Sequence, residues 1–264
     1  MGRRTERIEF TGSGGARLSG VIEAPSDDDG EGLVLAHCFT CSKDLPTIVK
    51  LARGLVAAGY TVLRFDFTGL GDSDGDFADT TLSTDVGDVA HAAAALSDHG
   101  VEPVGAVGHS LGGLAVLLAA HRLQTVRAVA VVNAPCGTGH LRGVLAGAED
   151  RIRAEGSADV RLAGRPVVIS AAFLDDLDAH DAERRVAELG RPLLIVHAAE
   201  DAEIDVAEGE CLFAAARQPK SFVALSGADH LLTDRAAPAR AAAVIADFFA
   251  RAGPGGVGHE TDTG

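Results

Sequence analysis

Short apolar runs alternate with longer amphipathic stretches along most of the chain. The apolar runs are continuous rather than alternating, and we predict that they form buried strands at 33–37, 61–67, 104–108, 126–132, 192–198 and 221–227. The stretches between them have apolar residues at helical spacing, and the clearest predicted helices are 45–59, 83–100 and 111–123. Continuous apolar strands separated by amphipathic helices are typical of a parallel sheet covered on both faces.

The first part of the chain departs from this rhythm. Residues 7–10 and 18–24 have β-type composition, and the Gly-rich segment 11–16 lies between them. This pattern predicts an antiparallel pair of strands that opens the sheet. The expected architecture is therefore α/β, with a mostly parallel eight-stranded sheet and helices on both of its faces.

A long interval separates the fourth and fifth predicted parallel strands. More than fifty residues lie between 126–132 and 192–198, well beyond the few residues of an ordinary connection. We expect a small cap insertion over about 136–190, because insertions at the carboxyl edge of such a sheet usually cover a ligand site. An enlarged surface loop is the alternative interpretation.

Two elements are predicted inside this insertion. Residues 158–169 have the pattern of a small hairpin with Gly164 at its turn, and 178–190 has the pattern of a helix that Gly190 closes. We expect one domain over 1–264, with a tail at 253–264 whose composition is typical of disorder.

Composition and charge narrow the classes of partner. Hydrophobic residues make up 47% of the 264 residues, enough for a large core, and the formal net charge is −15. A strongly acidic protein is a poor partner for nucleic acid or an anionic membrane. Residues 1–10 contain no apolar signal region, and four cysteines without such a signal fit a reducing compartment. We therefore expect a cytoplasmic protein with a small-molecule substrate.

The strongest chemical signal is a G-x-S-x-G motif between a strand and a helix. The apolar strand 104–108 leads directly into Gly108–Gly112, and the helix 111–123 follows. This is the context of a nucleophile elbow, a tight turn that presents a serine hydroxyl above the edge of the sheet. We predict Ser110 as the nucleophile, flanked by glycines because larger side chains would collide with the neighbouring strand and helix.

A serine hydroxyl needs a base to take its proton. In this architecture the acid and the histidine follow the serine in the chain, each just after a later strand. Asp201 follows the strand 192–198, and His230 follows the strand 221–227. We predict a Ser110, Asp201 and His230 triad. Two neighbouring acids are alternatives to Asp201, namely Glu200 and Asp205.

The loop after the strand 33–37 contains the two cysteines of a C-x-x-C pattern, Cys38 and Cys41. In a nucleophile-elbow hydrolase this loop supplies one backbone amide of the oxyanion hole, and the residue after the nucleophile supplies the other. We therefore expect the amides of Phe39 and Leu111 to be the donors. No metal-ligand spacing is present, so we expect neither a metal nor a cofactor.

Several strings in the chain are similar to one group of hydrolases. The chain resembles the α/β-hydrolase superfamily over nearly its whole length, and in particular the hydrolase part of α/β-hydrolase/OsmC-family proteins, through "HCFTCSKD", "RFDFTGLGDSDG", "GHSLGG", "VRLAGRP" and "RQPKSFVALSGADHLL". The resemblance implies Ser110, Asp201 and His230 as the triad, with Phe39 and Leu111 as oxyanion donors. It also implies an association with an OsmC-like thiol peroxidase, although the sequence ends at Gly264 with no OsmC-like domain of its own.

The cysteines beside the predicted oxyanion amide allow two interpretations. Cys38 fits a buried, inert thiol. Alternatively, Cys38 and Cys41 form a thiol switch, in which reversible oxidation distorts the loop and stops hydrolysis. A zinc site at these cysteines would need a further Cys or His ligand, and no second C-x-x-C is present.

The sequence thus predicts a metal-independent serine hydrolase. Its substrate class is a carboxylic ester, with a thioester or amide as the next possibility, and its acyl group is small to medium in size. The alternatives are a non-catalytic partner of a separate OsmC-like protein and a redox protein that uses Cys38 and Cys41. The oligomeric state does not follow from the sequence.

Overall fold

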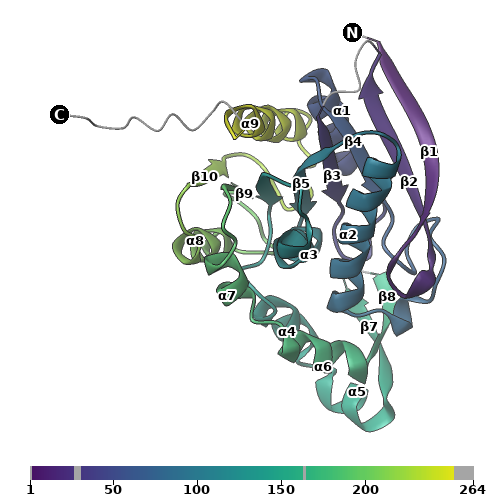
Figure 1. Ribbon diagram of the computed structural model, residues 1–264. Helices are drawn as coiled ribbons and strands as arrows, with labels where there is room; N and C mark the ends of the chain where they lie inside the picture. Colours follow the sequence, from purple (N-terminus) through teal and green to yellow (C-terminus); the bar gives the residue numbers. More distant parts are fainter. Residues whose placement is uncertain (1, 27–30, 163–164, 253–264) are drawn as a thin grey trace.

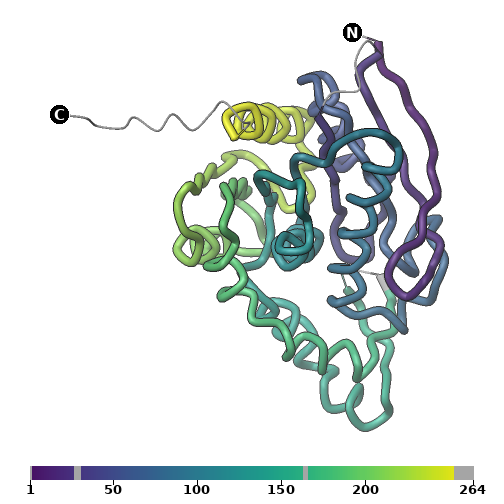
Figure 2. Tube along the Cα trace, viewed as in Figure 1, coloured from purple at the N-terminus to yellow at the C-terminus, as the bar shows by residue number. Residues whose placement is uncertain are grey.

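The computed structural model describes residues 2–26, 31–162 and 165–252 (Figure 1, Figure 2). Its centre is an eight-stranded sheet with the order β1-β2-β4-β3-β5-β6-β9-β10. The strands β1 and β2 are antiparallel to their neighbours, and every other pairing is parallel. The bounds of these strands are Arg3–Thr11, Arg17–Pro25, Thr61–Phe65, Gly32–Ala36, Pro103–His109, Ala128–Val132, Leu193–Ala198 and Lys220–Leu225 in the same order.

Helices cover both faces of this sheet. In chain order, α1, α2, α3, α8 and α9 span Pro46–Ala57, Leu82–Asp98, Leu111–Ala119, Val206–Ala215 and Ala237–Arg251. One buried apolar cluster joins the sheet to α1 and α9, and a second joins it to α2, α3 and α8. Short 3-10 turns lie at Ser13–Gly15, Phe77–Asp79 and Ala120–Arg122. The predicted mostly parallel α/β sheet with an antiparallel opening pair is confirmed.

Local sequence signals set where the two longest early helices begin. Pro46 is the first residue of α1, where its fixed φ suits the helix and its missing N–H needs no partner. Thr81 and Thr84 form a reciprocal capping pair at the start of α2. The central strands β3, β4, β5, β6 and β9 are buried along their whole length. This burial on both faces explains their continuous apolar sequences.

The chain between β6 and β9 leaves the sheet and forms a separate layer (Figure 1). It contains a two-stranded antiparallel sheet and four helices, with α4, α5, β7, β8, α6 and α7 at Gly139–Leu145, Glu149–Glu155, Ser157–Leu162, Arg165–Ser170, Ala171–Ala179 and Ala182–Ala187. Its apolar side chains continue one of the two core clusters of the main sheet. The segment is therefore packed against the domain.

Sequence patterns located only part of this layer. The expected hairpin corresponds to β7 and β8, although its proposed turn residue Gly164 lies outside the described residues. The helix expected over 178–190 is shorter at both ends, because α6 continues to Ala179, α7 begins only at Ala182, and α7 ends at Ala187, before Gly190. The helices α4 and α5 were not predicted, and the proposed disordered tail 253–264 lies outside the described residues.

Within the described part of the chain, each helix is too short or too polar to cross a bilayer.

One carboxyl group is buried between α2 and the insertion. Asp85 lies on the buried side of α2, and its pKa is raised well above the usual Asp range by burial and by the carboxylates of Asp88 and Asp176. The folded protein therefore keeps this proton at pH values where the unfolded chain releases it. It follows that the contribution of Asp85 to the free energy of unfolding becomes less favourable as the pH rises above about 4, the ordinary pKa of Asp.

We predict that Asp85→Asn stabilises the protein at pH 7, because the folded state no longer has to hold a proton that the unfolded chain releases. We expect a gain of about 0.5–2 kcal/mol, the usual size of a stabilising substitution. The gain should shrink as the pH falls to about 4, where roughly half of the unfolded chains have taken up this proton. Urea unfolding of both proteins at pH 4, 5.5 and 7 measures this difference. Asp159→Asn, at an exposed position in β7, is the matched control and should change stability little at any pH. A gain independent of pH would contradict the prediction.

Candidate active site

The turn between β5 and α3 places a serine hydroxyl at the edge of the sheet. Ser110 has φ 57° and ψ −127°, a left-handed backbone conformation that non-glycine residues rarely adopt. The Ser110 amide donates to the carbonyl of Val132 at 2.9 Å, which fastens the turn to the neighbouring strand β6. The expected elbow geometry is therefore present, and Ser110 is only 7% exposed.

Two glycines of the motif allow this turn to fit. A Cβ on Gly108 would lie 2.3 Å from the carbonyl oxygen of Gly112, in the first turn of α3. A Cβ on Gly112 would lie 2.2 Å from the carbonyl oxygen of His37, at the end of β3. The obstacles in both cases are backbone atoms, which cannot move aside. The close approach of β3, β5 and α3 therefore requires glycine at both positions.

The three residues of the expected triad lie side by side, although they come from three different loops. The Ser110 Oγ lies 3.1 Å from Nε2 of His230, and Nδ1 of His230 lies 2.8 Å from Oδ2 of Asp201. A neutral imidazole that donates from Nδ1 and accepts at Nε2 satisfies both contacts. The geometry is that of a nucleophile, a base and an acid that orients the base.

The structure distinguishes Asp201 from the two neighbouring acids. Oδ1 of Asp201 accepts the amides of Glu203 and Ile204, both at 2.9 Å. Burial raises the pKa of Asp201, but the hydrogen bonds from His230 and from these amides outweigh burial and hold that pKa below its usual range. The other two acids have different partners, since Glu200 accepts the Gly227 amide and Asp205 caps α8.

A buried asparagine, which the sequence analysis did not single out, holds the histidine loop. Asn133 follows β6, is fully buried and has φ 51°. Its side-chain amide donates to the carbonyl of His230 at 2.7 Å, and its Oδ1 accepts the amide of Ala198 at 2.7 Å. One side chain thus links the ends of β6 and β9 to the loop that carries His230.

His109 also holds the loop that carries His230. Its Nε2 donates to the carbonyl of His230 at 2.8 Å, and burial lowers the pKa of His109 to about 3. The ring is therefore neutral at pH 7. His109 thus fixes a backbone position of the loop that carries His230.

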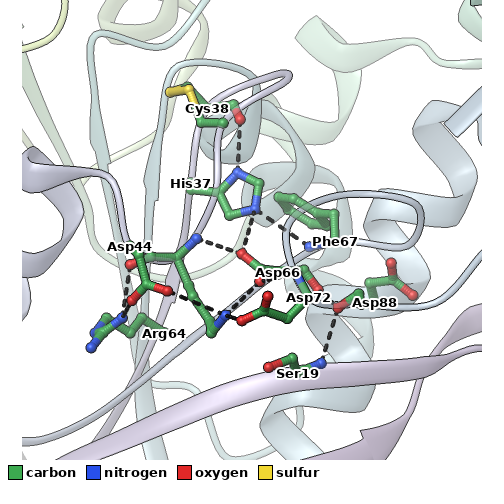
Figure 3. Close-up of polar contacts among 12 residues, drawn as sticks. Ser19, His37, Cys38, Asp44, Arg64, Asp66, Phe67, Asp72 and Asp88 are labelled. Carbon is green, nitrogen blue, oxygen red and sulfur yellow. Dashed lines mark hydrogen bonds and ion pairs between the residues drawn. A yellow bond between two sulfur atoms is a disulfide. The ribbon is translucent and has the colours of Figure 1, made fainter.

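The loop after β3 is held by a histidine at its base (Figure 3). Nδ1 of His37 donates to the carbonyl of Cys38 at 2.7 Å, and Nε2 accepts the Phe67 amide at 3.4 Å. Burial lowers the pKa of His37, so the ring is neutral and can fill both roles. The peptide between Cys38 and Phe39 is trans, so the Phe39 N–H points away from this carbonyl and from His37.

A buried ion pair supports the far end of the same loop (Figure 3). Asp66, at 0% exposure, accepts the backbone amide of Lys43 at 2.6 Å and its ammonium at 2.7 Å. The Lys43 ammonium also contacts Asp72 at 2.7 Å, and the Asp72 amide donates to Asp66. Burial lowers the pKa of Lys43, but these carboxylates outweigh burial and keep that pKa above its usual value.

All four cysteines are paired in the structure. Cys38 bonds to Cys41 within the loop after β3, and Cys136 bonds to Cys211 between the start of the insertion and α8. The expectation of a buried, inert thiol at Cys38 is therefore wrong. A chain without an apolar signal region is expected to keep its cysteines reduced, but the fold brings both pairs within bonding distance.

A cavity of about 200 Å³ opens above Ser110 and His230. The insertion forms part of its wall, through α4 and β7, and the loop after β3 forms another part. Its other lining residues are mainly apolar, namely Phe39, Leu45, Leu111, Pro135, Leu141, Val144, Leu162, Ile204 and Leu231. Glu203 is the acidic residue among the described residues that line it, and no Lys or Arg is among them. The space suits a small to medium apolar group.

The fold and this site define the class of protein: an α/β-hydrolase with its insertion over the carboxyl edge of the sheet. Residues 33–253 match the family described as the alpha/beta hydrolase family, and the chain belongs to that family.

Two solved structures and one curated relative are also similar to this chain. The esterase domain of a Rhodothermus marinus protein is 36% identical, with a TM-score of 0.77 over 95% of this chain and 99% of that chain. Est1E from Butyrivibrio proteoclasticus, solved with ferulic acid, is 20% identical, with a TM-score of 0.75 over 92% and 100% of the two chains. The uncharacterized protein YfhR of Escherichia coli (strain K12) is 23% identical over 86% of this chain and 73% of its own. The family match and the likeness to the Rhodothermus marinus esterase domain support a hydrolase, and the likeness to Est1E shows the fold.

The association with an OsmC-like thiol peroxidase, which the sequence resemblance implies, stays a prediction. So does the cytoplasmic location.

We predict that Asp66→Asn lowers the free energy of unfolding by about 3–5 kcal/mol, because it leaves the buried Lys43 ammonium without its main counter-charge. Asn also places an NH₂ group among donors that now meet a carboxylate. Urea unfolding at neutral pH measures the change. Asp74→Asn, which breaks an exposed ion pair with Arg17, is the matched control and should have a far smaller effect. Equal effects of the two substitutions would contradict the assigned role of Asp66.

Proposed function

We propose that this protein is a serine hydrolase that cleaves a carboxylic ester through an acyl-enzyme on Ser110. The observation that carries the proposal is the continuous contact from Ser110 through His230 to Asp201 at the floor of an apolar cavity. The likeness to the Rhodothermus marinus esterase domain, at 36% identity over nearly the whole chain, supports an ester as the substrate class.

The first half-reaction follows from the contacts of His230. As Ser110 Oγ attacks the ester carbonyl carbon, its proton passes to Nε2 of His230, and the ring becomes an imidazolium. Asp201 stabilises that charge and keeps the ring oriented through Nδ1. The imidazolium then gives its Nε2 proton to the departing alkoxide, which leaves as the alcohol. The acyl group remains on Ser110 as an ester.

The second half-reaction repeats these steps with water. His230 takes a proton from water, the resulting hydroxide attacks the acyl carbon, and Ser110 leaves with the proton that His230 returns. The carboxylic acid is the product. In both halves the carbonyl oxygen gains negative charge, and we propose that the amides of Phe39 and Leu111 donate to it. Leu111 begins α3, so the positive end of that helix faces the same oxygen.

We predict that Ser110→Ala lowers kcat about a million-fold, because removal of the nucleophile disables the whole triad. The substrates are p-nitrophenyl acetate, butyrate and octanoate, which differ only in acyl length. Intact mass after incubation with a fluorophosphonate should show one adduct on the wild type and none on the variant. Circular dichroism of the variant shows whether it is folded. Turnover within about tenfold of wild type by a folded variant would refute Ser110 as the nucleophile.

The charge of the residues that line the cavity also bears on which leaving groups it accepts. Oε2 of Glu203 lies 3.9 Å from Nε2 of His230, the atom that protonates the leaving group, and no Lys or Arg is among the described residues that line the cavity. We propose that this carboxylate disfavours leaving groups that carry a negative charge.

We predict that Glu203→Gln raises kcat/KM several-fold for an ester whose alcohol carries a carboxylate, because the substitution removes a like charge near that group. An uncharged ester of the same length should change little, which makes the two substrates internal controls for each other. The ratio of their kcat/KM values, measured at low and high salt, reports the charge effect. An unchanged ratio would show that Glu203 does not select the leaving group.

A further inference from the structure

A disulfide between two residues only three positions apart closes a loop around Phe39, whose amide is one of the two proposed oxyanion donors. Cys38 and Cys41 are bonded across Phe39 and Thr40, and all four residues line the cavity. The Cys41 amide donates to the carbonyl of Cys38 at 3.1 Å, so the bridge closes a tight turn. This part of the cavity wall is thus a backbone loop that a covalent bond closes.

The backbone inside this ring is held in an uncommon conformation. Thr40 has φ 58°, in the left-handed region that β-branched residues avoid. Such a conformation persists only where the surroundings over-determine it. The disulfide and the hydrogen bond from Cys41 to Cys38 both contribute to this constraint, because each joins the two ends of the turn.

The same contacts set the direction of the donor. The carbonyl of Cys38 accepts from Nδ1 of His37 and from the Cys41 amide. The Phe39 N–H belongs to the same trans peptide plane, so it rotates whenever that carbonyl rotates. If the backbone at Cys41 moves away, the Cys38 carbonyl loses one of its two hydrogen-bond donors. The peptide plane that carries the Phe39 N–H is then no longer held in one orientation.

We infer that the Cys38–Cys41 disulfide is a positioning element for the Phe39 amide, so that hydrolysis depends on the redox state of this pair. The inference rests on the proposed function and adds its regulation by thiols. The oxidised protein is the active form, which is the opposite of a switch in which oxidation stops the enzyme. A reducing environment lowers the rate of the chemical step and leaves substrate binding in place.

The sulfur chemistry is available from solvent. Cys38 is 3% exposed, whereas Cys41 is partly exposed. A thiolate of an external dithiol attacks Sγ of Cys41, the bond between the two sulfurs breaks, and Cys38 leaves as a thiolate that takes up a proton. The second thiol of the reagent then attacks the mixed disulfide and releases Cys41. The protein gains two electrons and two protons, and the dithiol becomes a cyclic disulfide.

The experiment isolates this pair from the second disulfide. Cys136→Ser combined with Cys211→Ser leaves Cys38–Cys41 as the sole bridge, and Cys38→Ser combined with Cys41→Ser leaves the other. Each double variant is assayed with p-nitrophenyl butyrate, oxidised and after dithiothreitol, and its rate of labelling by a fluorophosphonate is measured under the same conditions. Thiol titration establishes how many sulfurs each treatment releases.

We expect dithiothreitol to lower kcat of the Cys136/Cys211 variant by at least tenfold and by up to about 10²-fold, the lower cost of losing one oxyanion donor, with KM little changed. Oxidised glutathione should restore the rate. The Cys38/Cys41 variant should already be slow and should not respond to dithiothreitol. Unchanged thermal unfolding of the reduced protein would separate this effect from a general loss of structure.

Two results would overturn the inference in different ways. If titration shows two released thiols and both kcat and the labelling rate stay within about threefold, the disulfide does not position the amide, and the proposed hydrolase function is untouched. If the oxidised wild type neither hydrolyses any ester nor labels at Ser110, the proposed function fails, and this inference fails with it.

Discussion

The candidate site depends on the contact between the end of β3 and the first turn of α3. The carbonyl oxygen of His37 occupies the place where a Cβ on Gly112 would stand, at 2.2 Å. Because the two backbones meet there, the loop that contains Phe39 lies directly over Ser110 and Leu111. A single methyl group between them would separate the nucleophile from one of its proposed oxyanion donors. The polar contacts of the site therefore depend on this close packing of backbone against backbone.

Around this contact, several buried polar side chains have a defined partner. His37 is neutral and bridges Cys38 and Phe67, and Asp66 neutralises Lys43 beneath the same loop. A buried charge without a partner is costly, so these pairs fix one arrangement of the loop. The histidine loop is held in a comparable way by Asn133 and His109. Rigid support on both sides is what a site needs when its donors must already be in place before the reaction begins.

Much of this could be predicted from the sequence, for identifiable reasons. The strands β3, β4, β5, β6 and β9 are buried on both faces, so their apolar runs are continuous and their order along the chain is readable. Ser110 and Asp201 follow two of these strands and His230 follows the edge strand β10, which brings all three to one edge of the sheet. In contrast, Asn133 and the pair of Lys43 and Asp66 are ordinary polar residues in the sequence. Their importance comes from burial and from contacts between segments far apart in the chain.

The insertion was harder to predict because its helices are short and amphipathic over only one or two turns. Helices α4 and α5 have seven residues each, too few for the periodic pattern to stand out. The disulfide between Cys136 and Cys211 was missed for a different reason. Cys136 and Cys211 are separated by 75 residues, and only the fold brings them together.

That second disulfide has a consequence for how the fold can vary. It joins the residue just before the insertion to α8, which follows the loop that carries Asp201. The insertion is thus anchored to the domain at its entrance by a covalent bond and at its exit by β9. Its interior can change in length and sequence while both anchor points stay fixed relative to the triad. The sheet and the triad residues can therefore stay unchanged while the insertion that covers the cavity varies. A new substrate specificity can arise in the insertion without any change at the triad.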